Sequence, residues 1–189
     1  NECDLREEVM LILSDAVLLG TQGAWTVDEW AIGGHATGAH IAIAVAANEV
    51  LHAVKKVVLW GVQSYPDSNT YPCKRTLREN KDVNALVLNG SNDDIIKSAA
   101  YKKDGVVEFF KANMPPASSS PSFVNVALGD RRGCTQYVDV KGGNHAGCAH
   151  YGPHMFPHPD GIRTITLEQQ QRQMAEVTVG FLFSSTKAD

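Results

Sequence analysis

Short, continuous apolar runs recur along the chain and predict its strands. Such runs are typical of parallel strands that are buried on both faces, and they predict strands at Lys56–Val62 and Asn84–Leu88. The short apolar run Trp30–Ile32 predicts a further strand over Val27–Gly33. Two further segments, Phe123–Leu128 and Thr135–Val140, alternate apolar and polar residues on either side of a glycine-flanked turn. That alternation predicts a hairpin, or a strand with an edge partner.

Stretches with a helical period separate these runs and predict the helices. Asp4–Leu19 has apolar residues three and four positions apart and ends before a glycine, and residues 37–52 and 95–112 also have helical character. Thr166-Leu-Glu-Gln169 is a capping box that opens a helix reaching about Phe183. Strands that alternate with helices predict an α/β fold with a mainly parallel sheet flanked by helices.

The size of the chain predicts one domain. Its 189 residues, 43% of them hydrophobic, are enough to bury one core of ordinary size. Met114–Ser122 holds three prolines and four serines, which predicts an irregular excursion rather than a helix or strand. We interpret the chain as a single partial α/β domain in four segments. Residues 1–26 are a lead-in of helix and loop, and residues 27–112 extend from the first strand to the helix that follows the third strand. Residues 113–134 are an insertion, and residues 135–189 contain the histidine loop and the final helix.

Charge and hydropathy exclude some classes of partner. A net charge of −4 and a pI near 6.0 give no electrostatic case for nucleic acid or an anionic membrane surface. No apolar run approaches the roughly 18–20 residues that cross a bilayer. The chain begins at Asn1 without a methionine or a signal-like segment, so we expect a processed or truncated amino terminus, with an organellar or secreted location left open. The four cysteines have no C-x-x-C spacing, which argues against a zinc ribbon or redox motif and leaves their disulfide state open: Cys3, Cys73, Cys134 and Cys148.

The segment Glu29–His40 carries the clearest motif, Glu-Trp-Ala-Ile-Gly-Gly-His-Ala-Thr-Gly-Ala-His. An apolar strand, a turn flanked by Gly34 and Gly38, and an apolar helix follow one another as in a nucleophile elbow, G-x-S-x-G. The two glycines leave room for a sharp turn and for close approach of the helix to the strand. Alanine stands at position 36, where the nucleophile would be, and we predict a strained strand-to-helix turn there.

Candidate chemistry lies in three loops, because parallel sheets place their active groups beyond the carboxyl ends of their strands. One loop carries Ala36, one carries the neighbours Asp93 and Asp94, and one carries His145 directly after a Gly-Gly-Asn sequence. Nucleophile position, acid and histidine follow one another in the chain order of α/β-hydrolases.

These motifs resemble those of an α/β-hydrolase family with a W-x-I-G-G-H-S elbow and a G-G-N-H-A histidine loop followed by Y-G. The similarity extends from about Trp25 to Phe183, and the matching segments are Trp30–His35, Asn89–Asp93, Gly142–Ala146, Tyr151-Gly152 and the glutamine-rich helix start Thr166–Gln173. The chain is similar to the carboxyl-terminal part of that fold, and the resemblance implies a serine hydrolase architecture without cofactor or metal.

The resemblance also implies a role for each matching residue. His145 would be the general base that takes the proton of the nucleophile, and Asp93, or its neighbour Asp94, would orient the imidazole. The backbone N–H of Thr37 would be one oxyanion donor. Ala36 leaves the nucleophile position vacant, because a methyl group cannot attack a carbonyl carbon.

Two departures from the family pattern lead to two interpretations. Ala36 replaces the nucleophile, and only about thirty residues precede it, so the family's early strands and its oxyanion loop are missing. One interpretation is a non-catalytic α/β-hydrolase-like protein that acts as a scaffold or accessory subunit of a larger assembly. The other is a serine hydrolase for an ester or other acyl substrate, captured as a Ser→Ala variant. Nothing in the sequence indicates the substrate.

The missing strands also predict a partner. A sheet that begins at Val27–Gly33 would leave the N–H and C=O groups along that strand unpaired, which favours aggregation unless the edge is covered. We therefore expect another polypeptide, or an absent amino-terminal segment, against this strand.

A histidine-rich stretch near the carboxyl end is an alternative candidate site. It contains side chains of the types that bind metals, namely His145, Cys148, His150, His154 and His158. The prolines at 153, 157 and 159 prevent a helix from presenting these side chains on one face. We therefore interpret the stretch as a proline-stiffened loop with exposed histidines, and predict no metal site.

Overall fold

The computed structural model describes residues 8, 11, 29–47, 54–63, 76–80, 82–98, 106–118, 133–150, 152–153 and 158–184. The predicted helix Asp4–Leu19 lies outside these residues except for Glu8 and Leu11, which are helical. The predicted strand Phe123–Leu128 also lies outside them.

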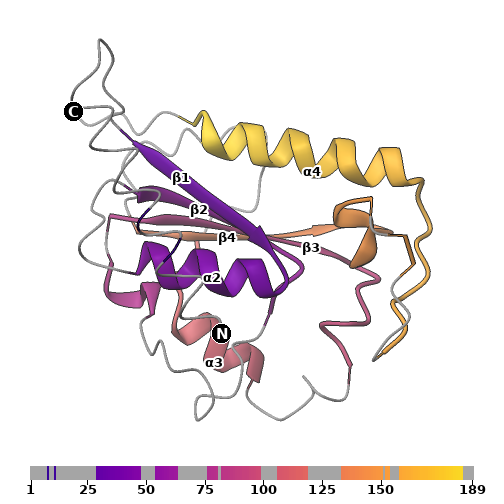
Figure 1. The fold of residues 1–189 in the computed structure, drawn as a ribbon, viewed down its shortest axis with the longest axis horizontal. Helices are drawn as coiled ribbons and strands as arrows, with labels where there is room; N and C mark the ends of the chain where they lie inside the picture. The colour runs from indigo at the N-terminus through magenta and orange to yellow at the C-terminus, as the bar shows by residue number, and fades with distance from the viewer. Residues whose placement is uncertain are drawn as a thin grey trace.

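The described strands form one parallel sheet in chain order, β1-β2-β3-β4. The strands are β1 (Trp30–His35), β2 (Val54–Trp60), β3 (Asn84–Gly90) and β4 (Thr135–Val140). The register places His35 opposite Trp60 and Gly90 opposite Val140, so the carboxyl ends of all four strands meet at one edge (Figure 1). This confirms the predicted α/β class with a parallel sheet.

Strand ends differ from the prediction by up to three residues. β1 extends past Gly33 to His35, because its ladder with β2 continues to the end of the sheet. Thr135–Val140 is β4, as predicted. Among the described residues it pairs with β3, and Ala117 forms an isolated bridge to Thr135. The pairing with β3 is parallel, and the predicted hairpin partner of β4, Phe123–Leu128, lies outside the described residues.

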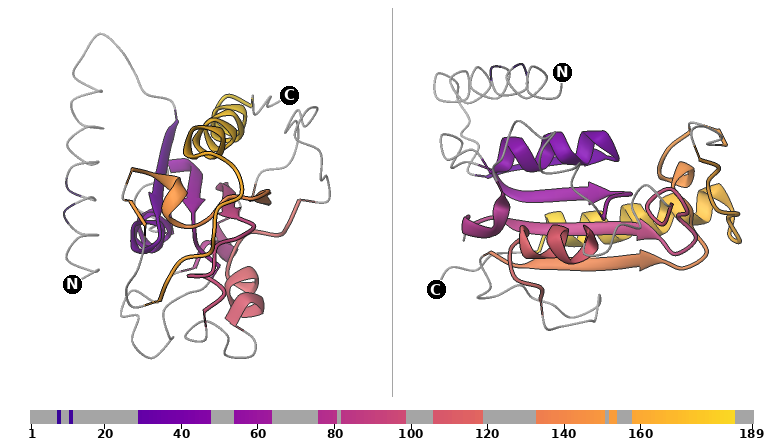
Figure 2. Two further views of the ribbon diagram at one scale, coloured as in Figure 1. Left: turned by 90° about the vertical axis from the view of Figure 1, so that its right-hand side faces the viewer. Right: turned by 90° about the horizontal axis from the view of Figure 1, so that it is seen from below.

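Helices cover both faces of the sheet (Figures 1 and 2). On one face lie α2 (Thr37–Ala46), α3 (Val106–Ala112) and the short η1 (Leu77–Glu79), and on the other lies α4 (Leu167–Leu182). A further short helix, η2 (Ala146–Cys148), is part of the histidine loop. The predicted capping box is confirmed at the start of α4: the Thr166 hydroxyl accepts from the Gln169 N–H, and the Gln169 side chain accepts from the Thr166 N–H.

The helix predicted over residues 95–112 is wrong at its beginning. Residues 94–97 form a turn, α3 is Val106–Ala112, and residues 99–105 lie outside the described part of the chain. The Asp93 side chain accepts the Ile96 N–H at 3.0 Å, and the Ser98 N–H donates to the Ile95 carbonyl at 3.2 Å. A side chain that captures a backbone N–H in this way offers the chain an alternative to a helix.

Alternation along the strands divides the core between the two faces. One set of buried side chains packs with α2 and with Phe110 of α3, and includes Val57, Leu59, Ala85 and Val87. The intervening residues form the second set, which packs with Met174 and Phe181 of α4 and includes Val58, Leu86 and Leu88. Since both faces are covered, β2 and β3 need apolar residues at nearly every position, which explains their continuous apolar runs.

A buried lysine fixes the carboxyl end of α4. Lys56 on β2 is only 6% exposed, and its Nζ donates to the carbonyls of Leu182 at 2.5 Å and Ser184 at 3.0 Å. A cation at this end of a helix satisfies carbonyls that have no intrahelical partner and complements the helix dipole. Lys56 therefore positions α4 on the sheet.

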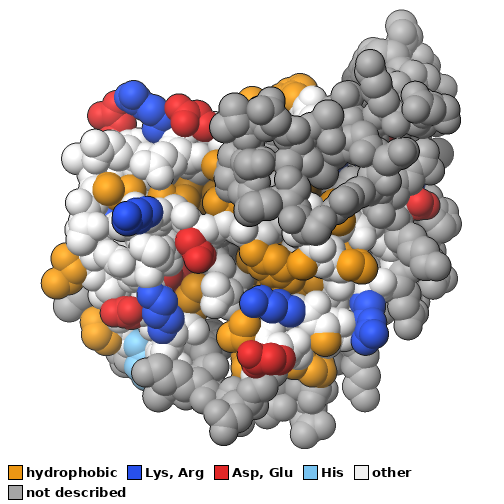
Figure 3. All heavy atoms as spheres, turned by 180° about the vertical axis from the view of Figure 1, so that it is seen from behind, with side chains coloured by type: hydrophobic (Ala, Val, Ile, Leu, Met, Phe, Trp, Pro, Cys, Tyr) orange, Lys and Arg blue, Asp and Glu red, His pale blue; other side chains and the backbone are white. Residues whose placement is uncertain are grey.

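The face seen in Figure 3 shows no strong segregation of charge among its described residues. In the view from behind in Figure 3, Lys and Arg side chains are interspersed with Asp and Glu side chains over the part of the face that is coloured by type. None of the helices in the described part of the chain combines the length and hydrophobicity that a membrane span requires.

Candidate functional site

Ala36 occupies a strained turn between β1 and α2. Its φ of 51° and ψ of −116° make it the single non-glycine residue with positive φ in the described ranges. Its N–H donates to the Trp60 carbonyl at 3.0 Å, and its own carbonyl accepts from the Ala39 N–H at 3.0 Å. A non-glycine residue in this region costs about 1–3 kcal/mol and persists only where its surroundings enforce it. The predicted strained strand-to-helix turn is confirmed.

Gly34 makes the close approach of α2 possible. A Cβ at position 34 would lie 2.2 Å from the carbonyl carbon and oxygen of Gly38, so no larger residue fits there. A Cβ at Gly38 would meet no atom within 4 Å. Position 34 of the motif therefore requires glycine for steric reasons, because the backbone of Gly38 lies against it.

His145 and Asp93 form a buried pair. The distance between His145 Nδ1 and Asp93 Oδ2 is 2.8 Å, Asp93 is completely buried and His145 is 5% exposed. Nδ1 is therefore the ring nitrogen that faces Asp93, and Nε2 is the ring nitrogen that faces away from it. The predicted contact between His145 and a carboxylate is confirmed. Asp93 makes it, whereas Asp94 is exposed.

The His145 ring packs on His35 and Gly61 at the carboxyl edge of the sheet. The centroids of the two imidazoles are 4.4 Å apart, with the planes tilted by 45°. A Cβ at Gly61, whose φ is 61°, would lie 2.9 Å from both His145 Cε1 and His35 Nε2. His35 directly precedes Ala36 in the chain. Gly61 directly follows Trp60, whose carbonyl accepts the Ala36 N–H. The His145 imidazole therefore packs against residues that adjoin the elbow.

Asn89 fixes the turn that contains Gly61. Its side chain is 3% exposed and holds Val62 from both sides, accepting the Val62 N–H at 3.0 Å and donating to the Val62 carbonyl at 3.4 Å. The Gly61 N–H donates to the Leu88 carbonyl at 3.1 Å. These bonds hold the small residue under the His145 imidazole.

The acid loop and the histidine loop are joined backbone to backbone. A Cβ at Gly90 would lie 2.4 Å from the Gly143 carbonyl oxygen, and that oxygen accepts the Asn92 N–H at 2.8 Å. The Ser91 hydroxyl accepts the Gly142 N–H at 2.8 Å. Glycine at position 90 thus allows the contact that brings Asp93 to His145.

Gln170 of α4 supports the histidine loop from within the core. It is fully buried, its Oε1 accepts the Asn144 N–H at 3.1 Å, and its Nε2 donates to the Asn144 carbonyl at 2.7 Å. A Cβ at Gly143 or Gly147 would collide with the Gln170 amide, at 2.9 Å and 2.0 Å. The two glycines and the glutamine are therefore complementary parts of one support.

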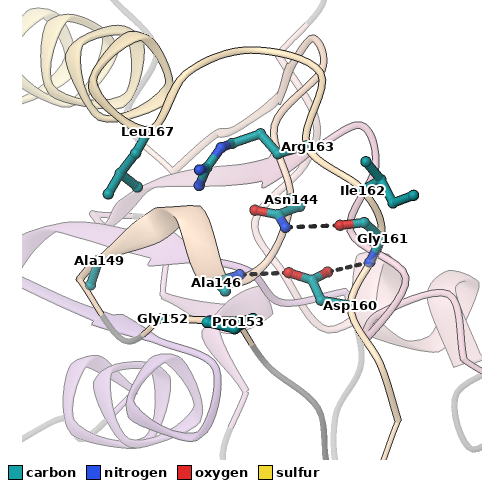
Figure 4. Close-up of a pocket in the computed structure, with 10 residues that line it drawn as sticks. All are labelled: Asn144, Ala146, Ala149, Gly152, Pro153, Asp160, Gly161, Ile162, Arg163 and Leu167. Carbon is teal, nitrogen blue, oxygen red and sulfur yellow. Dashed lines mark hydrogen bonds between the residues drawn. The ribbon is translucent and has the colours of Figure 1, made fainter.

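Asp160 and Asn144 close the outer side of the loop (Figure 4). The Asp160 Oδ2 accepts the Ala146 N–H at 2.8 Å, and the Asn144 side-chain amide donates to the Gly161 carbonyl at 2.8 Å. The residues on both sides of His145 are thus held by side chains, and the imidazole has little freedom to move.

Thr37, the expected oxyanion donor, is the first residue of α2. The first N–H groups of a helix have no intrahelical acceptor, so the Thr37 N–H points out of the helix at the elbow. This is compatible with an anion beside Ala36, and the role itself stays a prediction.

Cys148 is a half-buried free thiol near Asp93. Burial raises its pKa from the ordinary 9.0 to about 12, and the negative charges of Asp93 and Asp160 add to the effect. Among the described residues, no three His, Cys, Asp or Glu side chains come close enough together to hold a metal ion, and His154 lies outside those residues.

Three of the contacting residues were not predicted from the sequence. The sequence pattern places His35 in the elbow motif but assigns it no contact with His145. It places Gly61 in an apolar run, although a glycine at the end of a buried strand often indicates a turn. Gln170 had a usable signal, because it lies four residues before Met174 and eleven before Phe181, on the buried face of α4.

Comparison of the chain with models of protein families, with curated proteins and with solved structures found no match.

Proposed function

We propose that this protein is a non-catalytic α/β-hydrolase-like protein that serves as a scaffold or accessory subunit of a larger assembly. The observation that carries the proposal is the side chain at position 36. Ala36 has the strained backbone expected of a nucleophile elbow, and it directly follows His35, whose ring packs on that of His145. A methyl group at that point offers no atom that His145 could deprotonate, so a Ser-His-Asp mechanism cannot begin.

The sheet edges support the assembly part of the proposal. β4 carries Pro116–Ser118 alongside it, where Thr135 exchanges backbone hydrogen bonds of 2.8 Å with Pro116 and Ser118. β1 is the other end strand of the described sheet, and no described residue pairs with its outer edge. A strand from another polypeptide, or from a longer form of this protein, would satisfy the backbone groups of β1.

A second candidate function is a serine hydrolase for an ester or other acyl substrate, with the present chain as its Ser→Ala form. The intact His145–Asp93 pair favours it. A completely buried carboxylate is costly unless it is paired, and here it is oriented as in a working general-base pair. A serine at position 36 would place a hydroxyl on the same strained turn.

Two assays test these functions: hydrolysis of p-nitrophenyl butyrate by the chain with Ala36, and labelling of its Ala36→Ser variant. The non-catalytic proposal expects the chain with Ala36 to hydrolyse this ester no faster than its His145→Ala variant. Turnover that disappears in His145→Ala would overturn the proposal. The Ala36→Ser variant tests the second candidate, which expects labelling by a fluorophosphonate probe that is lost in the double variant Ala36→Ser/His145→Ala. An unlabelled but folded Ala36→Ser variant would argue against a hydrolase.

A further inference from the structure

A pocket of about 440 Å³ lies between the histidine loop and the segment that leads into α4 (Figure 4). Small-molecule sites commonly have volumes of roughly 300–1,000 Å³. Asn144 and Ala146 line this pocket, but His145 between them does not, because its ring faces Gly61 and His35. The pocket is therefore separate from the elbow and needs its own explanation.

Arg163 supplies the positive charge of the pocket. Its Nε donates to the Ile165 carbonyl at 3.0 Å, which holds the guanidinium in place. In Figure 4 the side chain extends over Asn144 toward Leu167. The structure gives the two terminal nitrogens of Arg163 no hydrogen bond or ion pair within the described part of the chain. They form a preorganised fork of the geometry that binds a planar carboxylate through two parallel hydrogen bonds.

Asp160 limits the charge that the pocket accepts. Its Oδ2 accepts from the Ala146 N–H and its Oδ1 from the Gly161 N–H, both at 2.8 Å, so both oxygens are engaged. The carboxylate nevertheless remains a negative charge in the wall of the pocket. The pocket wall thus carries the positive charge of Arg163 and the negative charge of Asp160. Because Asp160 repels an anionic ligand, this pair suits a ligand with a single negative charge better than a dianion such as phosphate.

The rest of the lining is largely apolar. Ile162 is 86% exposed, which is unusual for a large aliphatic side chain, and Leu167, Pro153 and Ala149 line the same pocket. A ligand that covers Ile162 would remove apolar surface from water. The pocket thus combines one guanidinium with an apolar wall.

We propose that this pocket binds a small monocarboxylate with a short aliphatic chain, whose carboxylate pairs with Arg163 and whose chain covers Ile162. The site is independent of the proposed function, because it uses none of the residues at the elbow. Its occupant would lie against Asn144 and Ala146, which flank His145.

Titration of the full chain with sodium hexanoate, followed by ¹H–¹⁵N NMR, tests the proposal. We expect saturable shifts of the backbone amides of Ala146 and Gly161, and binding at least about tenfold weaker for the neutral analogue hexanamide. Inorganic phosphate should bind more weakly than hexanoate. Absence of saturable binding, equal binding of hexanamide, or tighter binding of phosphate would each overturn the proposal.

Variants assign the binding to this pocket. Arg163→Gln should weaken hexanoate binding about tenfold or more, because it removes the charge and the fork. The matched control Arg172→Gln removes an exposed arginine on α4 that pairs with Glu168 outside the pocket, and should bind like the original chain. Ile162→Asp tests the same site at an exposed position that does not support the fold, and should also weaken binding. Unchanged affinity in either pocket variant would contradict the assignment.

Discussion

Gly61 lies directly under the imidazole of His145, so that a Cβ at position 61 would be 2.9 Å from His145 Cε1. The contact joins the end of β2 to the histidine loop, which follows β4. It also involves His35, the last residue of β1, whose Nε2 lies at the same distance from that Cβ. A residue without a side chain thus sets how closely three loops approach one another.

We predict that Gly61→Ala destabilises the protein by about 2–3 kcal/mol, through positive φ and through displacement of the two imidazoles. Gly152→Ala is the matched control, because Gly152 has a φ of 77° but a Cβ there would meet no atom within 4 Å. The control should lose only the backbone contribution of about 1 kcal/mol. Urea unfolding measures both, and equal losses would contradict the steric role of Gly61.

Gln170→Ala should destabilise the protein by about 2–4 kcal/mol, since it removes a fully buried side chain and leaves the Asn144 N–H and C=O without their partner. Gln173→Ala changes an exposed glutamine of the same helix and should stay within about 0.5 kcal/mol. The comparison uses thermal or urea unfolding together with the NMR signals of the His145 ring, which should shift only in Gln170→Ala. Equal stability of the two variants would show that Gln170 does not support the loop.

Ala36→Gly should stabilise the protein by about 1 kcal/mol, because glycine relieves the strain at φ 51° by more than it adds to the entropy of the unfolded chain. Ala175→Gly, at an exposed position within α4, should have the opposite sign and cost about 1 kcal/mol. Denaturant unfolding of the two variants measures the difference. A loss of stability in Ala36→Gly would mean that the elbow is not strained.

Cys148 should resist alkylation in the folded protein. Its pKa, raised to about 12, keeps the thiol protonated at pH 8, and only the thiolate reacts. We expect iodoacetamide to modify Cys148 at least about a hundredfold more slowly than an unfolded control at pH 8. Peptide mapping by mass spectrometry identifies the modified cysteine, and reaction at the rate of a free thiol would refute the prediction.

The raised pKa of Cys148 makes the free energy of unfolding depend on pH in the alkaline range. The folded-state pKa of Cys148 is higher than the ordinary 9.0, so its contribution to stability is complete below pH 9 and is lost as the pH rises toward about 12. Cys148→Ser should reduce this part of the alkaline loss.

The local parts of the fold were predictable from the sequence. The continuous apolar runs of β2 and β3, the capping box of α4 and the turn at Ala36 each depend on residues close together in the chain. Backbone propensity and hydrophobic period act over this short range, so the pattern is sufficient to indicate the element.

Tertiary structure decided which side chains meet. The choice of Asp93 over Asp94, the packing of His145 on His35 and Gly61, and the support from Gln170 all join residues far apart in the sequence. Asp93 also shows why the helix predicted from residue 95 fails, because one of its oxygens takes the Ile96 N–H while the other holds His145. Such contacts depend on strand register and on the space left by glycines, and neither quantity is encoded in the period of any single segment.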